Sequence, residues 1–141
     1  MKWFVYAVGN KKRDKYSSQC ELYLSRISRN VPVQARMFPD DISMYKSIRD
    51  SQDLILLDET GQLPENSKDF SNTINKILCN SSRDTVFAIG GAYGHIKEMR
   101  ERAIRSISLS PLTMPHQMAR LFLLEQLYRA LSILNNEPYS H

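Results

Sequence analysis

Short, nearly continuous apolar runs recur along the chain and end at glycine or acidic residues. The run at residues 3–8 ends at Gly9, the run at 85–89 ends at Gly90, and the run at 54–57 stops at Asp58. Such runs are typical of strands that are buried on both faces of a parallel sheet. With an alternating segment and a short late run, the predicted strands cover residues 3–8, 31–38, 54–57, 85–89 and 107–109.

Between these runs, apolar residues recur at intervals of three and four, which is the period of an amphipathic helix. In the first such stretch, Tyr16, Cys20 and Ile27 fall on one side. Asn66 or Ser67 is placed to cap a later helix. The predicted helices cover residues 16–27, 42–48, 67–78, 96–103 and 117–134.

Strands that alternate with helices at this spacing predict an α/β domain with a mostly parallel sheet flanked by helices. A chain of 141 residues that is 42% hydrophobic is long enough for one core and short for two, so residues 1–141 are expected to form a single domain. In such sheets ligands bind beyond the carboxyl ends of the strands. The candidate binding loops are therefore Gly9 and residues 57–61, 90–94 and 109–114.

The last predicted helix carries more apolar residues than an ordinary surface helix. Phe122 and Leu127 belong to a wide apolar face, but Leu121 and Tyr128 lie among polar residues on the opposite side. Such a helix is often buried on two sides. The second side packs either against another subunit, which would make a twofold homodimer through this helix, or under the terminal segment at 138–139.

The charge of the chain is unevenly distributed. The formal net charge of +4 permits an RNA partner without requiring one. Residues 1–36 carry eight Lys or Arg and two Asp or Glu. Lys11, Lys12, Arg13 and Lys15 cluster after the first strand, where they would favour contact with a polyanion. A solvated loop is the alternative interpretation.

Catalytic motifs are scarce in this sequence. The three histidines are too scattered for a metal site, and no Ser or Cys lies in a nucleophile-elbow pattern. Cys20 and Cys79 are expected to be reduced core residues. The paired glycines at 90–91 follow a strand, where they allow either the close approach of a flat ligand or a tight turn.

No apolar run approaches the roughly 20 residues that a membrane span requires. The chain starts with about seven apolar residues followed by basic ones, the reverse of the order in a secretory signal. The cytoplasm is therefore the expected compartment, with no membrane partner and no metal.

Three stretches in the second half of the chain form a recognisable combination: IGGAYG at 89–94, ISLSPLTMPHQMAR at 107–120 and EQLYRA at 125–130. The start agrees, with Ala7, Val8 and Gly9 followed by Lys11. Over nearly its whole length the chain resembles the ribosomal RNA large subunit methyltransferase H family, the pseudouridine N3 methyltransferases of the SPOUT superfamily.

The resemblance implies a C-terminal trefoil knot, an exception to the general absence of knots, and S-adenosylmethionine held in the knotted loops. It also implies pairing of two subunits through the C-terminal helix. The implied reaction is methylation of N3 of a pseudouridine in large-subunit (23S) ribosomal RNA, on the assembled ribosome. The implied cofactor contacts are Leu57, Gly90, Leu109, Ser110, Pro111, Leu112, Thr113 and Met114.

The candidate substrate contacts are His116, Arg120, Arg129, Tyr139 and His141, and any basic role falls to a histidine or an ordered water. The chain departs from the family in two places. Family members typically end in Tyr-His and a basic residue, whereas here Ser140 separates Tyr139 from His141. The stretch between Phe38 and Leu54 is also shorter, which trims the second helix.

Two other functions remain open from the sequence. One is a SPOUT methyltransferase that acts on another RNA and shares the cofactor loops. The other is a catalytically silent module that binds RNA or the ribosome. Cofactor binding distinguishes an enzyme from the silent module.

Overall fold

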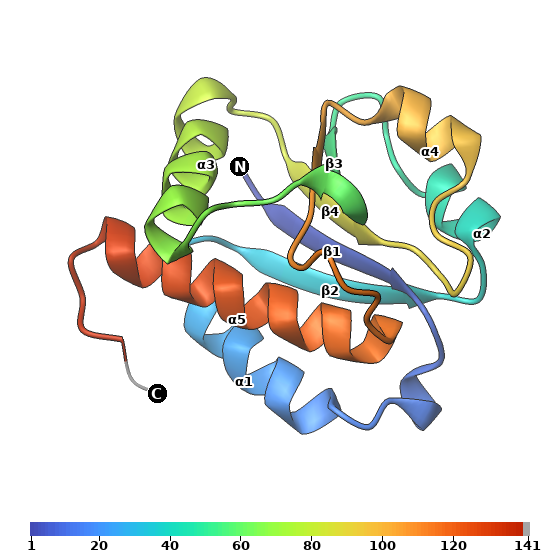
Figure 1. Cartoon of the computed structure of the whole chain (residues 1–141), viewed down its shortest axis with the longest axis horizontal. Helices are drawn as coiled ribbons and strands as arrows, with labels where there is room; N and C mark the ends of the chain where they lie inside the picture. The colour runs from blue at the N-terminus through green and yellow to red at the C-terminus, as the bar shows by residue number, and fades with distance from the viewer. Residues whose placement is uncertain (140–141) are drawn as a thin grey trace.

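The predicted strands form one parallel sheet in the order β2-β1-β4-β3-β5 (Figure 1). The computed structural model describes residues 1–139. Central strands β1, β4 and β3 are buried on both faces, which explains their continuous apolar sequences. The predicted α/β class is confirmed. The strands are β1 (Trp3–Val8), β2 (Val33–Phe38), β3 (Asp53–Gln62), β4 (Thr85–Ile89) and β5 (Arg105–Ile107).

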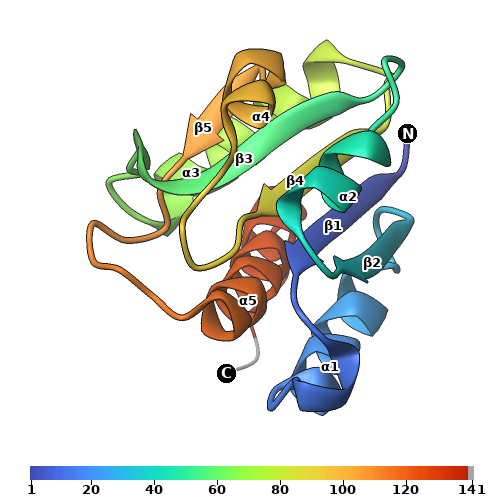
Figure 2. The same cartoon turned by 90° about the vertical axis from the view of Figure 1, so that its right-hand side faces the viewer.

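Helices cover both faces of the sheet, three on one side and two on the other (Figures 1 and 2). Alternate strand residues supply the two cores: Trp3 and Phe87 meet edge to face at 5.4 Å under one helical layer, whereas Tyr6 and Met44 lie in the other core. The first layer holds α1 (Ser17–Ile27), α3 (Ser67–Asn80) and α5 (His116–Leu134), and the second holds α2 (Asp41–Lys46) and α4 (Lys97–Arg102).

β3 continues past Leu57, so the prediction that it stops there is wrong. Both Leu57 and Gln62 pair with Ile107 of β5, and the residues between them form a bulge. Residues 58–61 are polar, acidic or glycine, which is the composition of a loop and explains the wrong prediction. The bulge instead keeps them within the strand and brings Asp58 and Glu59 to the edge of the sheet.

β5 covers Arg105–Ile107 rather than residues 107–109, because the chain leaves the sheet before Leu109. The expectation that both cysteines are core residues holds for Cys20, which is buried, and is wrong for Cys79, which is exposed near the end of α3. Burial raises the pKa of the Cys20 thiol to about 11.

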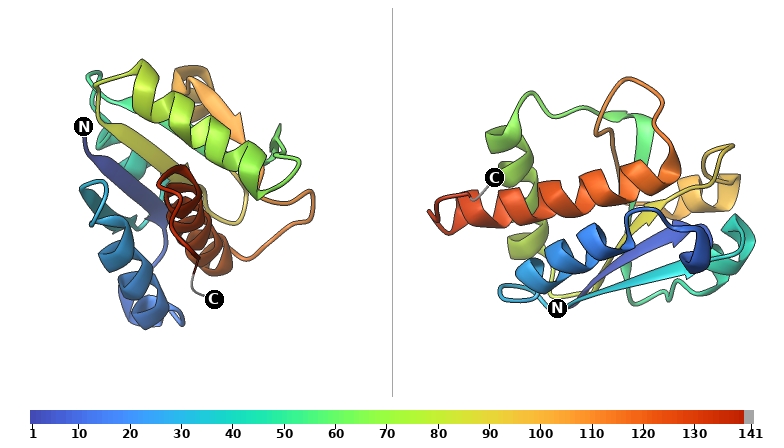
Figure 3. Two further views of the ribbon diagram at one scale, coloured as in Figure 1. Left: turned by 90° about the vertical axis from the view of Figure 1, so that its left-hand side faces the viewer. Right: turned by 90° about the horizontal axis from the view of Figure 1, so that it is seen from below.

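α5 is covered on two sides by α1 and α3 of the same chain (Figure 3). Leu124 and Leu131 are buried, whereas Phe122, which belongs to the predicted apolar face, is 39% exposed. A helix held between two neighbours has two apolar stripes, so a single helical-wheel face could not locate them. Tyr128 lies between Tyr23 of α1 and Tyr139 of the terminal segment, with ring centroids 6.0 and 5.5 Å away.

Within residues 1–139, no helix combines the length and apolarity that crossing a membrane would need. The same residues contain no group of three metal-binding side chains placed to share an ion.

Gly61 is required by the close approach of β3 to β5. A Cβ at this position would lie 2.7 Å from the carbonyl carbon of Ser106 and 2.8 Å from the nitrogen of Ile107, and both are backbone atoms. We expect Gly61→Ala to lower the free energy of unfolding by about 1–3 kcal/mol, measured by urea denaturation. Gly9→Ala is the control, because its nearest contact is the flexible Met37 Cε at 3.2 Å. Equal stability of both variants would contradict this account of the bulge.

Candidate active site

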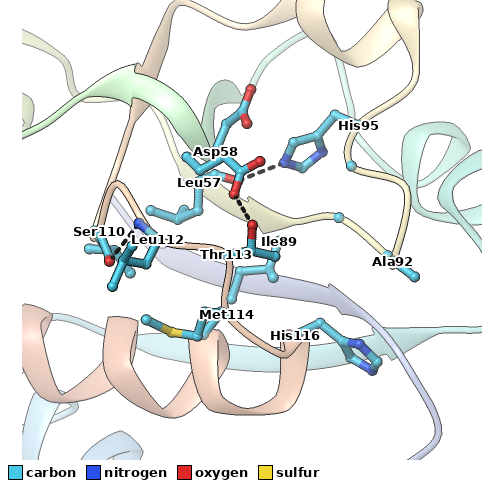
Figure 4. Close-up of a pocket in the computed structure, with 16 residues that line it drawn as sticks. Leu57, Asp58, Ile89, Ala92, His95, Ser110, Leu112, Thr113, Met114 and His116 are labelled. Atoms are coloured by element: carbon cyan, nitrogen blue, oxygen red, sulfur yellow. Dashed lines mark hydrogen bonds between the residues drawn. The ribbon is translucent and has the colours of Figure 1, made fainter.

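A cavity of about 180 Å³ opens at the carboxyl ends of β3 and β4 (Figure 4). The bulged part of β3 and the loops after β4 and β5 meet there with the first turn of α5, at the end of the sheet that the rule for parallel sheets predicts. Its wall is formed by Leu57, Asp58, Glu59, Ile89, Gly90, Gly91, Ala92, Gly94, His95, Leu109, Ser110, Leu112, Thr113, Met114, His116 and Ala119.

The structure brings most of the predicted cofactor residues together in this wall. Leu57 comes from β3, Gly90 from the loop after β4, and the rest from the loop at 108–115. Pro111 belongs to the same loop but does not line the cavity. The residues that do line it are Leu57, Gly90, Leu109, Ser110, Leu112, Thr113 and Met114.

Hydrogen bonds fix the loop at 108–115. Ser108 Oγ donates to the carbonyl of Ser110 at 2.8 Å, and the Leu112 amide donates to Ser110 Oγ at 3.0 Å. Thr113 Oγ1 donates to Glu59 Oε2 at 2.9 Å, which ties the loop to the bulge of β3. The bonded loop leaves Leu112 75% exposed at the rim of the cavity.

The glycine loop at 90–94 owes its sequence to a tight turn. A Cβ on Gly90 would lie 2.8 Å from the carbonyl oxygen of Gly94, so the contact that excludes a side chain is with the loop's own backbone. Gly94 has a φ of 79°, in the region that favours glycine. Of the two interpretations of the paired glycines, the structure therefore supports the turn at Gly90.

His95 links the glycine loop to the end of β3. Its Nε2 lies 3.0 Å from the carbonyl oxygen of Leu57, which can only accept, so Nε2 carries the proton. The side chain is 8% exposed, and its Nδ1 has no hydrogen-bond partner among the described residues. Burial lowers the pKa of His95, outweighing the opposite effects of the Leu57 carbonyl and of Asp58 and Asp41.

Asp58 is charged and paired. Its burial acts to raise the pKa of the carboxyl, but hydrogen bonds from Arg100 of α4 and from Thr60 outweigh this, so the pKa lies below its usual value. The ion pair with Arg100 turns one of the two carboxylates of the cavity wall toward α4. Glu59 is the other, and it bonds Thr113.

Among the predicted substrate contacts within residues 1–139, only His116 lines the cavity. Arg120, one turn along α5, is 7% exposed and forms a buried ion pair with Asp14. Burial lowers the pKa of its guanidinium. This side chain therefore joins α5 to the segment after β1 and is not brought to the cavity.

Arg129 and Tyr139 lie together on α5 and the terminal segment, away from the residues of the cavity wall. Arg129 forms an ion pair with Glu125, and its guanidinium stacks 4.2 Å from the Tyr139 ring centroid. The Tyr139 hydroxyl donates to Glu125. Burial and the Glu125 carboxylate raise the pKa of Tyr139. His141, the last predicted contact, lies outside the described residues.

The model of a family described as "Predicted SPOUT methyltransferase" matches residues 1–141 of the chain. The chain belongs to the SPOUT methyltransferase family.

Three relatives of this SPOUT methyltransferase bear the name ribosomal RNA large subunit methyltransferase H. The protein from Trichlorobacter lovleyi is 39% identical over 145 residues, which cover 93% of this chain and 94% of its own length. That from Christiangramia forsetii is 35% identical over 153 residues and covers 97% of each. That from Porphyromonas gingivalis is 34% identical over 157 residues, covering 100% of this chain and 99% of its own.

Three polar residues of the cavity, Asp58, Glu59 and His95, have no functional role that the sequence pattern predicts. In the sequence, Asp58 and Glu59 fall in a candidate loop with no predicted role, and His95 is one of three histidines too scattered for a metal site. The available signal was position, because Asp58 directly follows a buried run and His95 directly follows the glycine loop. Asp58 bonds Arg100 and Glu59 bonds Thr113. Both partners are distant in the sequence, so local sequence gives no sign of these contacts.

The depressed pKa of His95 makes the stability of this SPOUT methyltransferase depend on pH. As pH falls through the ordinary histidine pKa of 6.5, His95 becomes protonated in the unfolded state while it is still neutral in the folded state. The free energy of unfolding therefore decreases as pH falls. We expect His95→Gln, which keeps a donor near Nε2 but does not titrate, to reduce this loss in urea denaturation between about pH 7.5 and 5. His116→Gln is the control, and parallel pH profiles for wild type and His95→Gln would contradict the assignment.

Proposed function

We propose that this chain uses S-adenosylmethionine to methylate N3 of a pseudouridine in large-subunit ribosomal RNA, as a homodimer acting on assembled ribosomes in the cytoplasm. The observation that carries the proposal is the cavity where the bulged residues 57–59 of β3 meet the loops at 90–95 and 109–114. It supports the proposal together with the names of the relatives, which align with the chain over nearly its full length.

The cavity fits the two chemical halves of S-adenosylmethionine. Leu109, Leu112 and Met114 offer apolar surface for an adenine ring, and the backbone of their loop offers polar groups for its edge. Asp58 and Glu59 place carboxylates on the same wall, which suits a ligand that carries a sulfonium and an ammonium. When bound, this cofactor supplies an electrophilic methyl group.

The protein's own contribution is alignment. The fold provides no nucleophile elbow and the reaction needs no covalent intermediate, so positioning of the two reactants is the main source of rate. His116, at the first turn of α5, is the predicted substrate contact that reaches the cavity. We assign to it the contact with the target base, and removal of the N3 proton falls to this imidazole or to an ordered water.

In the proposed homodimer, Arg129 and Tyr139 of one subunit contribute to the cavity of the other subunit. Arg129 lies thirteen residues beyond His116 on the same helix, about 20 Å along its axis, so it cannot serve its own chain's cavity. Met118 and Phe122 are 46% and 39% exposed on the same open side of α5. A second copy packed on this side would cover them and bring its Arg129 and Tyr139 toward the first cavity.

The trefoil knot is part of the same proposal. Ser108 bonds the carbonyl of Gln62 at 2.9 Å, and Thr113 bonds Glu59, so the loop before α5 is laid against the end of β3. From there α5 returns beneath β1 and β4 (Figure 3). This path supports a threaded C-terminal segment.

Transfer of radiolabelled methyl from S-adenosylmethionine to intact ribosomes lacking the modification tests the function. We expect label on a pseudouridine of large-subunit RNA, with free ribosomal RNA and transfer RNA as parallel substrates. Label on transfer RNA alone would overturn the substrate in favour of another RNA. Absence of both label and cofactor binding would favour a silent RNA-binding module.

The bond between Thr113 and Glu59 should contribute to cofactor affinity. Thr113→Val keeps the shape of the side chain and removes the donor, which breaks the bond of the loop at 108–115 to Glu59 and leaves the bond between Ser108 and Gln62 in place. We expect S-adenosylmethionine to bind about 2- to 10-fold more weakly in titration calorimetry. Thr73→Val, which removes a 3.4 Å bond within α3, is the control. Unchanged affinity in Thr113→Val would show that this bond has no part in the pocket.

A further inference from the structure

Tyr93 stands at the tip of the glycine loop with its side chain fully in solvent, at 103% relative exposure. The loop is closed by a hydrogen bond of 3.0 Å from the Gly94 amide to the Gly91 carbonyl and by a β-bridge between the same residues. Gly91, Ala92 and Gly94 line the cavity, whereas Tyr93 does not. A short rigid turn therefore holds a large aromatic ring outside the wall of the cavity.

No ring stacking or cation–π contact within residues 1–139 involves this ring. Aromatic side chains bury a large apolar area, and a Tyr that buries none gains nothing for folding. An exposed aromatic ring is, however, the usual platform on which proteins stack unpaired nucleobases. Tyr93 lies beside the cavity, where an RNA strand would pass when one of its nucleotides enters the cavity.

The second feature is the basic cluster after β1, which lies at the same edge of the sheet as the glycine loop. Its side chains are exposed, and no ion pair joins any of them to an acidic group within residues 1–139. The segment is the short 3-10 helix η1 (Lys11–Arg13) and the residues that follow it. Its members are Lys11, Lys12, Arg13 and Lys15.

This cluster is fixed in place next to the cavity. The Lys15 amide donates to Gln117 Oε1 at 3.3 Å, and Gln117 Nε2 donates to the Arg13 carbonyl at 3.0 Å. The buried pair of Asp14 and Arg120 joins the same two segments. Gln117 follows His116, which lines the cavity, so the backbone of the basic cluster is bonded to the same turn of α5 that forms part of the cavity wall.

The two features leave the sheet from neighbouring strands. β1 and β4 pair in parallel, and their ends lead into η1 and into the glycine loop, both of which lie at the edge seen in Figure 2. Of the carboxylates near these loops, Asp58 is paired with Arg100, whereas Glu59 and Asp40 accept from the neutral Thr113 hydroxyl and Ser43 amide and keep their charge. Asp41 lies beside Gly91, and its Oδ1 has no hydrogen-bond partner within residues 1–139. The lysines and arginine of the basic cluster are exposed and form no ion pair within residues 1–139, so their charge is available to an incoming polyanion.

We propose that this edge is an RNA-docking lip, in which Tyr93 stacks on an unpaired base next to the target nucleotide and Lys11, Lys12, Arg13 and Lys15 bind phosphates of the same strand. The proposal rests on the proposed function, since it assumes that the cavity receives a nucleotide of RNA. It assigns substrate affinity to residues outside the cofactor pocket.

Steady-state methylation of ribosomes by Tyr93→Ala tests the stacking. We expect the KM for ribosomes to rise about 5- to 100-fold, with kcat at saturating ribosomes and the affinity for S-adenosylmethionine unchanged. Tyr93→Trp keeps an aromatic face and should retain the wild-type KM. Ile104→Ala removes another exposed apolar side chain, 61% exposed, before β5, and is the matched control. A wild-type KM in Tyr93→Ala would overturn the role of the ring.

The cations are tested by the salt dependence of ribosome binding in co-sedimentation. The double variant Lys11→Ala and Lys12→Ala should bind more weakly at low salt and show a shallower slope of log affinity against log salt, by about 0.7 for each lost phosphate contact. The backbone bonds of η1 are untouched. Lys68→Ala with Lys76→Ala, two exposed lysines of α3, is the control. Equal slopes in the two double variants would overturn the role of η1.

Measuring ribosome binding and methylation together distinguishes failure of the RNA-docking lip from failure of the proposed function. Normal methylation with no effect of either variant overturns the lip alone. Ribosome binding that depends on Tyr93 and η1 without any methyl transfer supports the lip and overturns the proposed function. Neither binding nor transfer by the wild-type chain overturns both.

Discussion

All five strands run in the same direction, so their carboxyl ends lie along one edge of the sheet and every loop that follows a strand begins there. The cavity wall, the glycine turn, η1 and the bulge of β3 all depend on this one constraint. Asp14 and Arg120, distant in the sequence, meet because α5 begins at this same edge and so starts beside the segment that follows β1. Helix α5 closes the arrangement, since its first turn contacts both the cavity and η1.

The sequence predicted the sheet well because apolar composition alone determines a strand that is buried on both faces. The run at 85–89 became β4 without change of boundary. It also predicted which loops would meet, because topology follows from strand direction. Local pattern failed where a residue's environment comes from elsewhere in the chain: the extension of β3 depends on pairing with β5, and the burial of Arg120 depends on Asp14.

The candidate site shows the same division between local and distant information. A glycine pair after a strand is visible in sequence, but whether it serves a ligand or a turn depends on the position of Gly94, which only the structure gives. His95 is polar and lies among glycines, yet its partner is a backbone carbonyl 38 residues earlier. Every residue has a backbone carbonyl, so the residue type at position 57 does not indicate that it accepts this hydrogen bond.

The buried pair of Arg120 and Asp14 also has a consequence for synthesis of the protein. The two residues are 106 positions apart, and the basic segment is held by Gln117 and Arg120 of the last helix. During translation the first strand and η1 leave the ribosome long before α5 exists, so the lysine-rich edge cannot reach its final position until the chain is nearly finished. A nascent or truncated chain thus lacks both the wall contributed by His116 and the anchored cations, and only the completed protein presents them together.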